Sequence, residues 1–318
     1  MRSPEQKRQV LALAGTLSAE LKERALSTTG LEEVVERRGE WLRADRAFQD
    51  QATLVNVGGV QIGGGKVAVM AGPCSVESEE TMTEVARICR IAGAHILRGG
   101  AFKPRTSPYA FQGLGWEGLR LLKEAGDAQG LPVISEIMDQ THLDAFLHYD
   151  VDCLQVGARN MQNFSLLKAI AKAGKPVLLK RGLAATVAEW LSSAEYLLAH
   201  GCDQVVLCER GIRTFETATR NTLDLSVVPL LASWTHLPVV VDPSHATGKP
   251  ALIPPLSLAA IVAGAAGIAV EVHPRPEQAR SDGPQALLPG ELAELIAKGR
   301  AVAGAAGYGF HRQMDLPA

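Results

Sequence analysis

The stretch PVLLKRGLAATVAEWLSSAEYLLAHGCDQVVLCER (176–210) contains the pattern that decides the fold. Two short runs of aliphatic and β-branched residues, PVLLKR (176–181) and QVVLCER (204–210), enclose a segment with helical periodicity. This order is typical of a βαβ unit, in which a helix joins two parallel strands. The same alternation continues along the chain from residue 67 onward.

Eight strands of this kind are predicted, each followed by a helical segment. Their spacing suits one strand and one helix per unit, as in a (β/α)₈ barrel. An open doubly wound sheet is the alternative that periodicity alone leaves open, but eight units in regular succession favour the closed α/β barrel. The predicted strands cover residues 67–72, 95–100, 132–137, 153–158, 176–181, 204–210, 238–243 and 267–272.

The chain is predicted to have three parts. Residues 1–52 form an N-terminal helical extension, because 4–27 and 30–48 carry helical periodicity and many charges. The barrel domain covers 53–305 and begins with TLVNVGGVQIGGGK (53–66), whose glycine turn predicts a β-hairpin that closes the barrel floor. Residues 306–318 form a C-terminal tail.

Composition narrows the class of protein. Hydrophobic residues make up 47% of the 318 residues and charged residues 21%, which is typical of a globular protein. The net charge of −2 gives no general attraction to nucleic acid or to an anionic membrane. The five cysteines form no CxxC pair, so we expect free thiols and a cytoplasmic location. The apolar run at 256–272 is interrupted by glycines and is interpreted as helix, turn and strand.

Charged side chains collect at the carboxyl ends of the predicted strands, where a barrel of this type carries its chemistry. Six of them are cations, and six positive charges would repel one another unless anions filled the space between them. Arginine suits phosphate and carboxylate oxygens in particular, so we expect at least two anionic groups in the site. The cations are Arg98, Lys103, Arg105, Arg159, Lys180 and Arg210.

A second group at the strand ends offers metal donors: Cys74, His245, Glu271 and Asp282. A thiolate, an imidazole and two carboxylates suit Mn²⁺, Fe²⁺, Co²⁺ or Zn²⁺ better than Mg²⁺ or Ca²⁺, which prefer oxygen alone. Taken alone, Cys74 is better explained as a buried inert thiol, the usual state of a lone cysteine.

Seven segments together resemble a known family. The barrel resembles that of 3-deoxy-D-arabino-heptulosonate 7-phosphate (DAHP) synthase, type I-beta branch, over about residues 53–305. The segments are AGPCSVES (71–78), LRGGAFKPRTSPYAFQG (97–113), QVGARNMQN (155–163), LLKRG (178–182), CERGIRT (208–214), DPSHATG (242–248) and EVHPRPEQARSDGPQ (271–285).

The resemblance implies a condensation of phosphoenolpyruvate with erythrose 4-phosphate and water, the first step of the shikimate pathway. It implies one divalent metal ion, with Mn²⁺ as the first expectation, held by Cys74, His245, Glu271 and Asp282. It also implies that phosphoenolpyruvate is bound by Arg98, Lys103, Arg159, Lys180 and Arg210 with the Ala158 backbone, and that erythrose 4-phosphate is bound by Arg105 and Thr106. Glu136 then matches an acid that holds a water, Lys103 matches a proton donor, and His245 has a catalytic role.

Three other functions were weighed. The related synthase that uses arabinose 5-phosphate typically carries a KANRSS-like run where this chain has KPRTS (103–107). Sialic-acid synthases carry an added antifreeze-like domain, which we do not find. A catalytically silent barrel should have lost a metal donor or a cation, whereas this sequence keeps all of them.

Regulation and assembly are less determined by the sequence. The segment before the hairpin is too short for the ferredoxin-like or chorismate-mutase-like domains found in this branch. It is expected to form a helical cap, or a docking segment for a separate regulatory protein. The resemblance also implies a homotetramer or homodimer.

Overall fold

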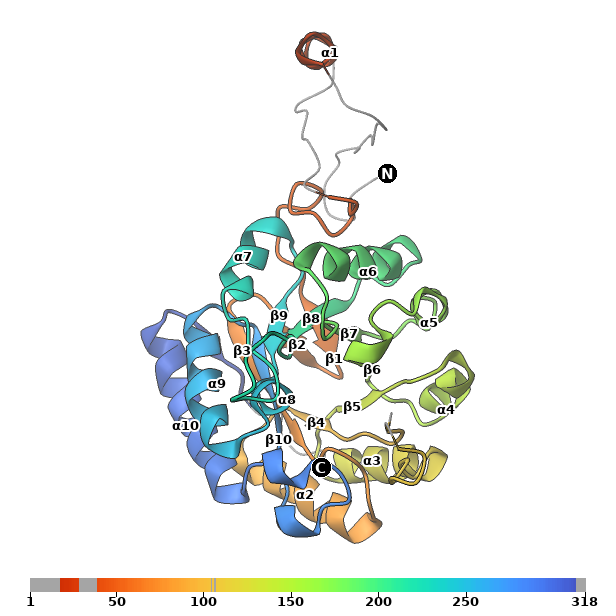
Figure 1. Ribbon diagram of the computed structural model, residues 1–318, viewed down its shortest axis with the longest axis vertical. Helices are drawn as coiled ribbons and strands as arrows, with labels where there is room; N and C mark the ends of the chain where they lie inside the picture. Colours follow the sequence, from red (N-terminus) through yellow and green to blue (C-terminus); the bar gives the residue numbers. More distant parts are fainter. Residues whose placement is uncertain (1–17, 29–38, 104, 106, 313–318) are drawn as a thin grey trace.

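The computed structural model describes residues 18–28, 39–103, 105 and 107–312, and it contains a closed ring of parallel strands surrounded by helices (Figure 1). Each predicted barrel strand is present, and pairing of the last strand with the first closes the ring. The (β/α)₈ prediction is confirmed. The strands are β3 (Lys66–Gly72), β4 (Ile96–Arg98), β5 (Val133–Glu136), β6 (Cys153–Val156), β7 (Val177–Lys180), β8 (Val205–Glu209), β9 (Val239–Val241) and β10 (Gly267–Glu271).

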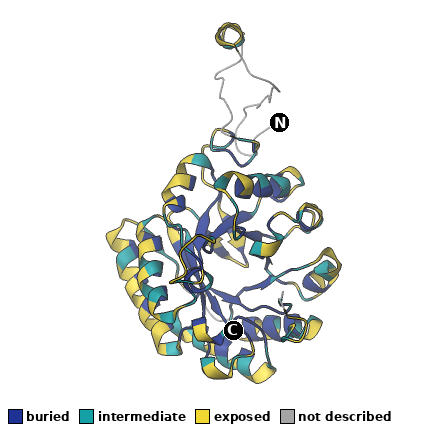
Figure 2. Ribbon diagram, viewed as in Figure 1, coloured by how far each residue is buried: buried dark blue, intermediate teal, exposed yellow. Residues whose placement is uncertain are grey.

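The helices cover the outside of the ring, with buried faces toward the strands and exposed faces toward solvent (Figure 2). Local signals set their ends. Helix α2 begins after Ser78, whose hydroxyl accepts from the Thr81 amide, and ends at Gly93 in the left-handed conformation. The helices around the barrel are α2 (Glu79–Ala92), α3 (Trp116–Ala128), α4 (Leu143–His148), α5 (Phe164–Ile170), α6 (Val187–Ala199), α7 (Val227–Trp234), α8 (Pro243–Thr247), α9 (Ile253–Val262) and α10 (Pro289–Ala305).

Short 3₁₀ helices lie in the loops between these elements. They are η1 (Gln140–His142), η2 (Ala158–Asn160), η3 (Pro250–Leu252), η4 (Pro276–Gln278) and η5 (Gly283–Gln285). Two of them, η2 and η5, follow strands at the carboxyl end of the barrel and carry predicted site residues or their neighbours. Within the described residues, no helix is both long and apolar enough to cross a membrane.

A β-hairpin closes the amino end of the barrel, as predicted. Its strands are β1 (Val55–Val57) and β2 (Val60–Ile62). Their buried side chains join one apolar cluster with interior barrel residues such as Met70 and Ile134. The hairpin lies at the strand starts, because a Cβ on Gly58 would lie 2.4 Å from the Cβ of Pro132, just before β5.

The N-terminal extension is only partly helical. Helix α1 (Ala19–Leu26) is present, but the predicted helix over 30–48 is wrong for residues 39–48, which form turns. Contacts with the barrel override the local periodicity there. Glu195 of α6 accepts hydrogen bonds from the amides of Arg43 and Ala44, and Trp41 stacks on Trp234 of α7. Residues 4–17 and 30–38 of the predicted helices lie outside the described residues.

The end of the chain adds a strand that we did not predict. Strand β11 (Gly309–Phe310) pairs in parallel with Lys66 and Val67, the first residues of β3. Two residues are too few to give a periodic signal in the sequence. Residues 313–318 of the expected tail lie outside the described part.

Candidate active site

A cavity of about 310 Å³ opens at the carboxyl end of the barrel. Most predicted site residues line it, and they come from successive strand ends and the loops that follow them. Cys74, Arg98 and Glu271 are buried beside it, and Thr106 lies outside the described residues. The predicted residues that line the cavity are Lys103, Arg105, Glu136, Ala158, Arg159, Lys180, Arg210, His245 and Asp282.

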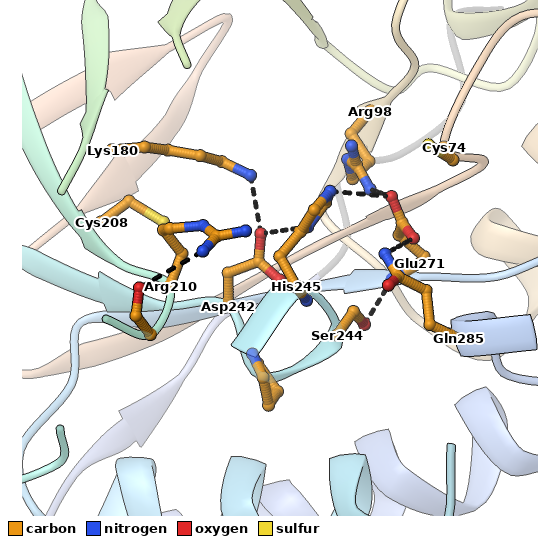
Figure 3. Close-up of polar contacts among 12 residues, drawn as sticks. Cys74, Arg98, Lys180, Cys208, Arg210, Asp242, Ser244, His245, Glu271 and Gln285 are labelled. Carbon is orange, nitrogen blue, oxygen red and sulfur yellow. Dashed lines mark hydrogen bonds and ion pairs between the residues drawn. The ribbon is translucent and has the colours of Figure 1, made fainter. Parts of the chain in front are cut away.

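Two buried cations at neighbouring strand ends differ in their partners (Figure 3). Lys180 closes β7 and donates to Asp242 Oδ2 at 2.6 Å. Arg210 follows β8 and is only 5% exposed, yet its one hydrogen bond to a described residue goes to the Gly211 carbonyl oxygen at 3.3 Å. Burial lowers the pKa of Arg210, and Arg220 acts in the same direction against the attraction of the Asp242 carboxylate. A buried guanidinium with no carboxylate hydrogen-bonded to it among the described residues indicates a place for an anionic ligand.

Lys103 lies at the bottom of the cavity. Its ammonium donates to the Cys74 carbonyl oxygen at 3.1 Å and to Cys74 Sγ at 3.0 Å. Burial alone would lower the pKa of Lys103, but the groups around it, Cys74 first and then the Glu136 and Glu271 carboxylates, raise it. The side chain is therefore a cation at neutral pH and can donate a proton to a group that becomes more basic.

Arg105 and Arg159 lie nearer the mouth. Arg105 is half-buried and Arg159 is exposed, and neither makes an ion pair within the described part of the chain. By contrast, Arg98 is buried and bound to Glu271 Oε1 at 2.8 Å, so part of its charge is already compensated. The cations thus divide into buried, partly paired groups and outer groups whose donors face the cavity.

Glu136 occupies the end of β5. Its Oε2 accepts from Gln155 Nε2 at 3.1 Å. A Cβ on Gly157 would lie 2.0 Å from Glu136 Oε1, so a side chain there would displace the carboxylate from this position. Ala158 follows at the start of η2, and its backbone borders the same cavity.

The four predicted metal donors lie in two contacting pairs. Cys74 Sγ is 3.5 Å from Asp282 Oδ2, and His245 Nε2 is 3.3 Å from Glu271 Oε1. Ligands about 2.0–2.3 Å from one tetrahedral ion have similar mutual separations. Within the described residues, no three His, Cys, Asp or Glu side chains converge closely enough to hold an ion in this conformation. The donor types and the distances within each pair fit a metal ion. In this conformation, two of the donor atoms instead bind cations: Cys74 Sγ binds Lys103, and Glu271 Oε1 binds Arg98.

His245 is oriented for a role as ligand. Its Nδ1 lies 2.7 Å from Asp242 Oδ2, so an Nδ1–H donates there and the Nε2 lone pair faces Glu271. A carboxylate behind a ligating histidine is the usual arrangement at metal sites. Burial lowers the pKa of His245, which favours the neutral imidazole that binds metals.

The negative groups beside the cations remain ionised. Burial acts to raise the pKa of Glu271, but His245, Arg98 and Lys103 lower it to about 2. Asp242 has a pKa well below its ordinary value, because His245 and Lys180 outweigh the effect of burial. Burial, Glu271 and Asp282 raise the pKa of the Cys74 thiol to about 11, although Lys103 and Arg98 act in the opposite direction.

Two polar residues of the site were missed by the sequence reasoning. Arg220 lines the cavity, and Gln285 is buried against Glu271. Arg220 resembles an ordinary surface cation in sequence. Gln285 carries no charge, and its position at the end of SDGPQ was the only available signal.

A closed (β/α)₈ barrel with buried and incompletely paired cations at its carboxyl end is the architecture of a barrel enzyme that acts on anionic substrates. The chain belongs to the DAHP synthetase I family, whose model matches residues 44–303.

Individual relatives agree with this assignment. The chain is 46% identical over 302 residues to phospho-2-dehydro-3-deoxyheptonate aldolase of Thermotoga maritima, covering 95% of this chain and 89% of that protein. The 2-dehydro-3-deoxyphosphooctonate aldolase of Acidithiobacillus ferrooxidans is 32% identical over 247 residues, covering 72% and 86%. The second relationship is therefore weaker and covers less of this chain.

Solved structures give the same result. The crystal structure of the Thermotoga maritima DAHP synthase matches with a TM-score of 0.84 at 46% identity, covering 93% of this chain and 87% of that one. A truncated form of 3-deoxy-D-arabino-heptulosonate 7-phosphate synthase from the same organism matches with a TM-score of 0.80 at 45% identity. That match covers 86% of this chain and 100% of the truncated form.

Proposed function

We propose that this protein condenses phosphoenolpyruvate with D-erythrose 4-phosphate and water, giving 3-deoxy-D-arabino-heptulosonate 7-phosphate and phosphate. This reaction is the first step of the shikimate pathway, which leads to the aromatic amino acids. Membership of the DAHP synthetase I family supports the assignment. The observation that carries it is Arg210, a buried cation in a cavity of further cations, whose hydrogen bond within the described residues goes to a backbone carbonyl and not to a carboxylate.

The most deeply buried cations suggest where phosphoenolpyruvate binds. Phosphoenolpyruvate has a phosphate and a carboxylate, and Lys103, Lys180 and Arg210 offer buried positive charge for both. Arg98 and Arg159, with the Ala158 backbone, complete the site predicted for this substrate. The predicted erythrose 4-phosphate contacts, Arg105 and Thr106, follow Lys103 in the sequence, and Arg105 is half-buried where Lys103 is buried.

Cys74, His245, Glu271 and Asp282 would hold one divalent ion, with Mn²⁺ first and Fe²⁺, Co²⁺ or Zn²⁺ as chemically similar alternatives. The bound ion would act as a Lewis acid on the aldehyde oxygen. Support comes from the two donor pairs, at 3.5 and 3.3 Å, and from the carboxylate behind His245.

The chain's own residues supply the proton transfers. Lys103 is kept protonated by its anionic neighbours and would donate a proton to the alkoxide formed from the aldehyde. Glu136 would accept a proton from the water that adds to the carbon bearing phosphate. The arginines hold the two reactants at reacting distance, which removes much of the entropic part of the barrier.

The test compares two aldose phosphates. Purified protein with Mn²⁺ is mixed with phosphoenolpyruvate and either erythrose 4-phosphate or arabinose 5-phosphate, and the product is identified by mass spectrometry. We expect a seven-carbon product with erythrose 4-phosphate only. An eight-carbon product formed only from arabinose 5-phosphate would overturn the substrate assignment, and no product with either sugar would overturn the reaction.

We also propose a homo-oligomer, a dimer or tetramer, that works in the cytoplasm. The segment before residue 53 would act as a cap or as a docking site for a separate regulatory protein. Feedback inhibition of the isolated chain by aromatic amino acids should then be weak or absent. Light scattering on the purified protein, and assays with phenylalanine or tyrosine at micromolar concentrations, check these points.

A further inference from the structure

We propose that Gln285 is a positioning residue for the metal half of the site, which fixes the Glu271 carboxylate to the turn that carries Asp282. The inference rests on the proposed metal site. It concerns a residue that neither contacts the cavity for phosphoenolpyruvate nor belongs to the predicted donor set.

Both ends of the Gln285 side chain are hydrogen-bonded, and Figure 3 shows the end that faces Glu271. The residue is buried, its Nε2 donates to Glu271 Oε2 at 2.5 Å, and its Oε1 accepts from an Arg220 guanidinium nitrogen at 2.7 Å. A carboxylate only accepts and a guanidinium only donates, so these partners determine which way the amide points. Glutamate could not donate to Glu271, and an aliphatic side chain could bind neither partner.

The turn before Gln285 is tightly packed and internally hydrogen-bonded. Asp282 has a φ of 48° in the left-handed region, and the 3₁₀ helix η5 begins directly after it. The Gln285 amide donates to the Asp282 carbonyl oxygen at 3.1 Å, and a Cβ on Gly283 would lie 2.0 Å from the Pro276 carbonyl oxygen. A non-glycine residue keeps such a conformation only when its surroundings enforce it. Asp282 and Gln285 are therefore fixed relative to each other.

Arg220 strengthens this coupling from outside. The same guanidinium nitrogen that donates to Gln285 lies 3.7 Å from Asp282 Oδ2. Because the Arg220 side chain is 39% exposed, the ion pair with Asp282 is a weak contribution by itself. Its effect on the site is to hold the outer end of the Gln285 amide.

Gln285 is expected to prevent the Glu271 carboxylate from rotating toward Arg98. Oε1 lies between Arg98, at 2.8 Å, and His245 Nε2, at 3.3 Å, while Oε2 is bound by Gln285. Without Gln285, the buried Oε2 would lose its donor and could turn toward Arg98, whose planar fork favours two parallel bonds to one carboxylate. That rotation would take Glu271 away from His245. Gln285 thus keeps one carboxylate oxygen beside the imidazole.

The test measures Mn²⁺ binding instead of turnover. The full chain is stripped with chelator and titrated with Mn²⁺ by calorimetry, as the parent and as Gln285→Met, which has similar length but no hydrogen bonds. We expect the Mn²⁺ Kd to rise about 10- to 100-fold, the range typical for loss of a residue that orients a ligand. The matched control is Gln155→Met, because Gln155 is also buried and donates to a site carboxylate, Glu136, outside the donor set. Its Mn²⁺ Kd should equal that of the parent.

Each outcome decides between the proposals. Parent-like Mn²⁺ affinity in Gln285→Met would overturn the role of Gln285 and leave the metal site standing. A parent chain that binds no Mn²⁺ would remove the metal site, and this inference with it. If Gln285→Met fails to fold, as judged by its thermal transition, Arg220→Met replaces it: a raised Kd supports the inference, and an unchanged Kd overturns it.

Discussion

The two ends of the barrel bury different kinds of side chain. At the carboxyl end, the almost fully buried side chains are charged: Lys103, Lys180, Arg210 and Glu271. Lys103 binds Cys74, Lys180 binds Asp242, and Glu271 binds Arg98. At the amino end, the hairpin places valine and isoleucine side chains into the barrel, where they pack with apolar residues of the strands. The amino end is filled by apolar side chains, whereas the carboxyl end opens into a cavity lined by charged ones.

The charged carboxyl end is expected to serve ligand binding, and the apolar floor is expected to serve stability. Buried charges cost free energy even when paired, so a cluster of them is retained for what it binds. Buried aliphatic side chains lower the free energy of the folded state in proportion to the area removed from water. We therefore expect substitutions at the carboxyl end to change turnover and ligand binding, and substitutions at the floor to change unfolding.

The largest effect is expected from Lys103→Met. The variant loses the proposed proton donor but keeps a side chain of similar length, so kcat should fall about 10²- to 10⁴-fold. Steady-state assays with phosphoenolpyruvate and erythrose 4-phosphate, at matched metal content, measure this change. Parent-like turnover would remove Lys103 from the proton-transfer role.

Ile62→Ala makes the corresponding change at the floor. Ile62 is fully buried in the cluster between hairpin and barrel, so its truncation should lower the free energy of unfolding by about 2–5 kcal/mol. The kcat/KM of the folded variant should match that of the parent. Urea unfolding gives the first quantity, and a large loss of kcat/KM at temperatures where the variant is folded would contradict the separation of the two ends.

A buried histidine just before β4, His95, should destabilise the fold when it is protonated. His95 Nδ1 accepts from the Val69 amide, and its Nε2 lies 3.1 Å from the His311 carbonyl oxygen, so the neutral ring satisfies both. Burial lowers the pKa of His95 from 6.5 to about 4. The unfolded chain therefore takes up this proton first, and stability falls as the pH drops from 7 to 4, by about 3 kcal/mol from this group.

Unfolding free energies of the parent and His95→Gln across that pH range test the point. Glutamine can accept from one backbone group and donate to the other without titrating, so the variant should lose less stability at low pH. Equal pH slopes in the two proteins would show that His95 does not contribute.

A smaller effect is expected from glycines at the floor. Gly58 and Gly65 both have positive φ, but a Cβ on Gly58 would lie 2.4 Å from Pro132 Cβ, whereas nothing lies within 4 Å of one on Gly65. Both alanine variants should therefore carry backbone strain, and Gly58→Ala should be less stable than Gly65→Ala by about 1–3 kcal/mol. Equal stability in thermal unfolding would mean that the hairpin can shift away from Pro132.

The sequence predicted the parts of the molecule that repeat or carry charge. Eight strands could be located because each is a short apolar run between helical segments, and charged strand ends are visible in the sequence as departures from that pattern. The hairpin was predicted from its paired glycines. Contacts between distant residues were not visible, as shown by Glu195, whose bonds to the Arg43 and Ala44 amides replace a predicted helix with turns.

Contacts between residues distant in sequence were not visible within the site either. The predicted donors Cys74 and Asp282 lie 3.5 Å apart, but the sequence did not show that Asp282 sits in a left-handed turn. Gln285 had no charge to mark it, and its importance depends on Glu271 and Arg220, which are distant in sequence. Residue types at strand ends could be predicted, whereas their orientation required the structure.

The central claim is that the charged carboxyl end forms one metal-dependent site for phosphoenolpyruvate and erythrose 4-phosphate. The most direct test removes bound metal with chelator, then follows phosphoenolpyruvate absorbance with erythrose 4-phosphate before and after Mn²⁺ is added. We predict no consumption before addition and rapid consumption after it. Equal consumption without metal would contradict the role of the four donors, and no consumption after addition would contradict the claim as a whole.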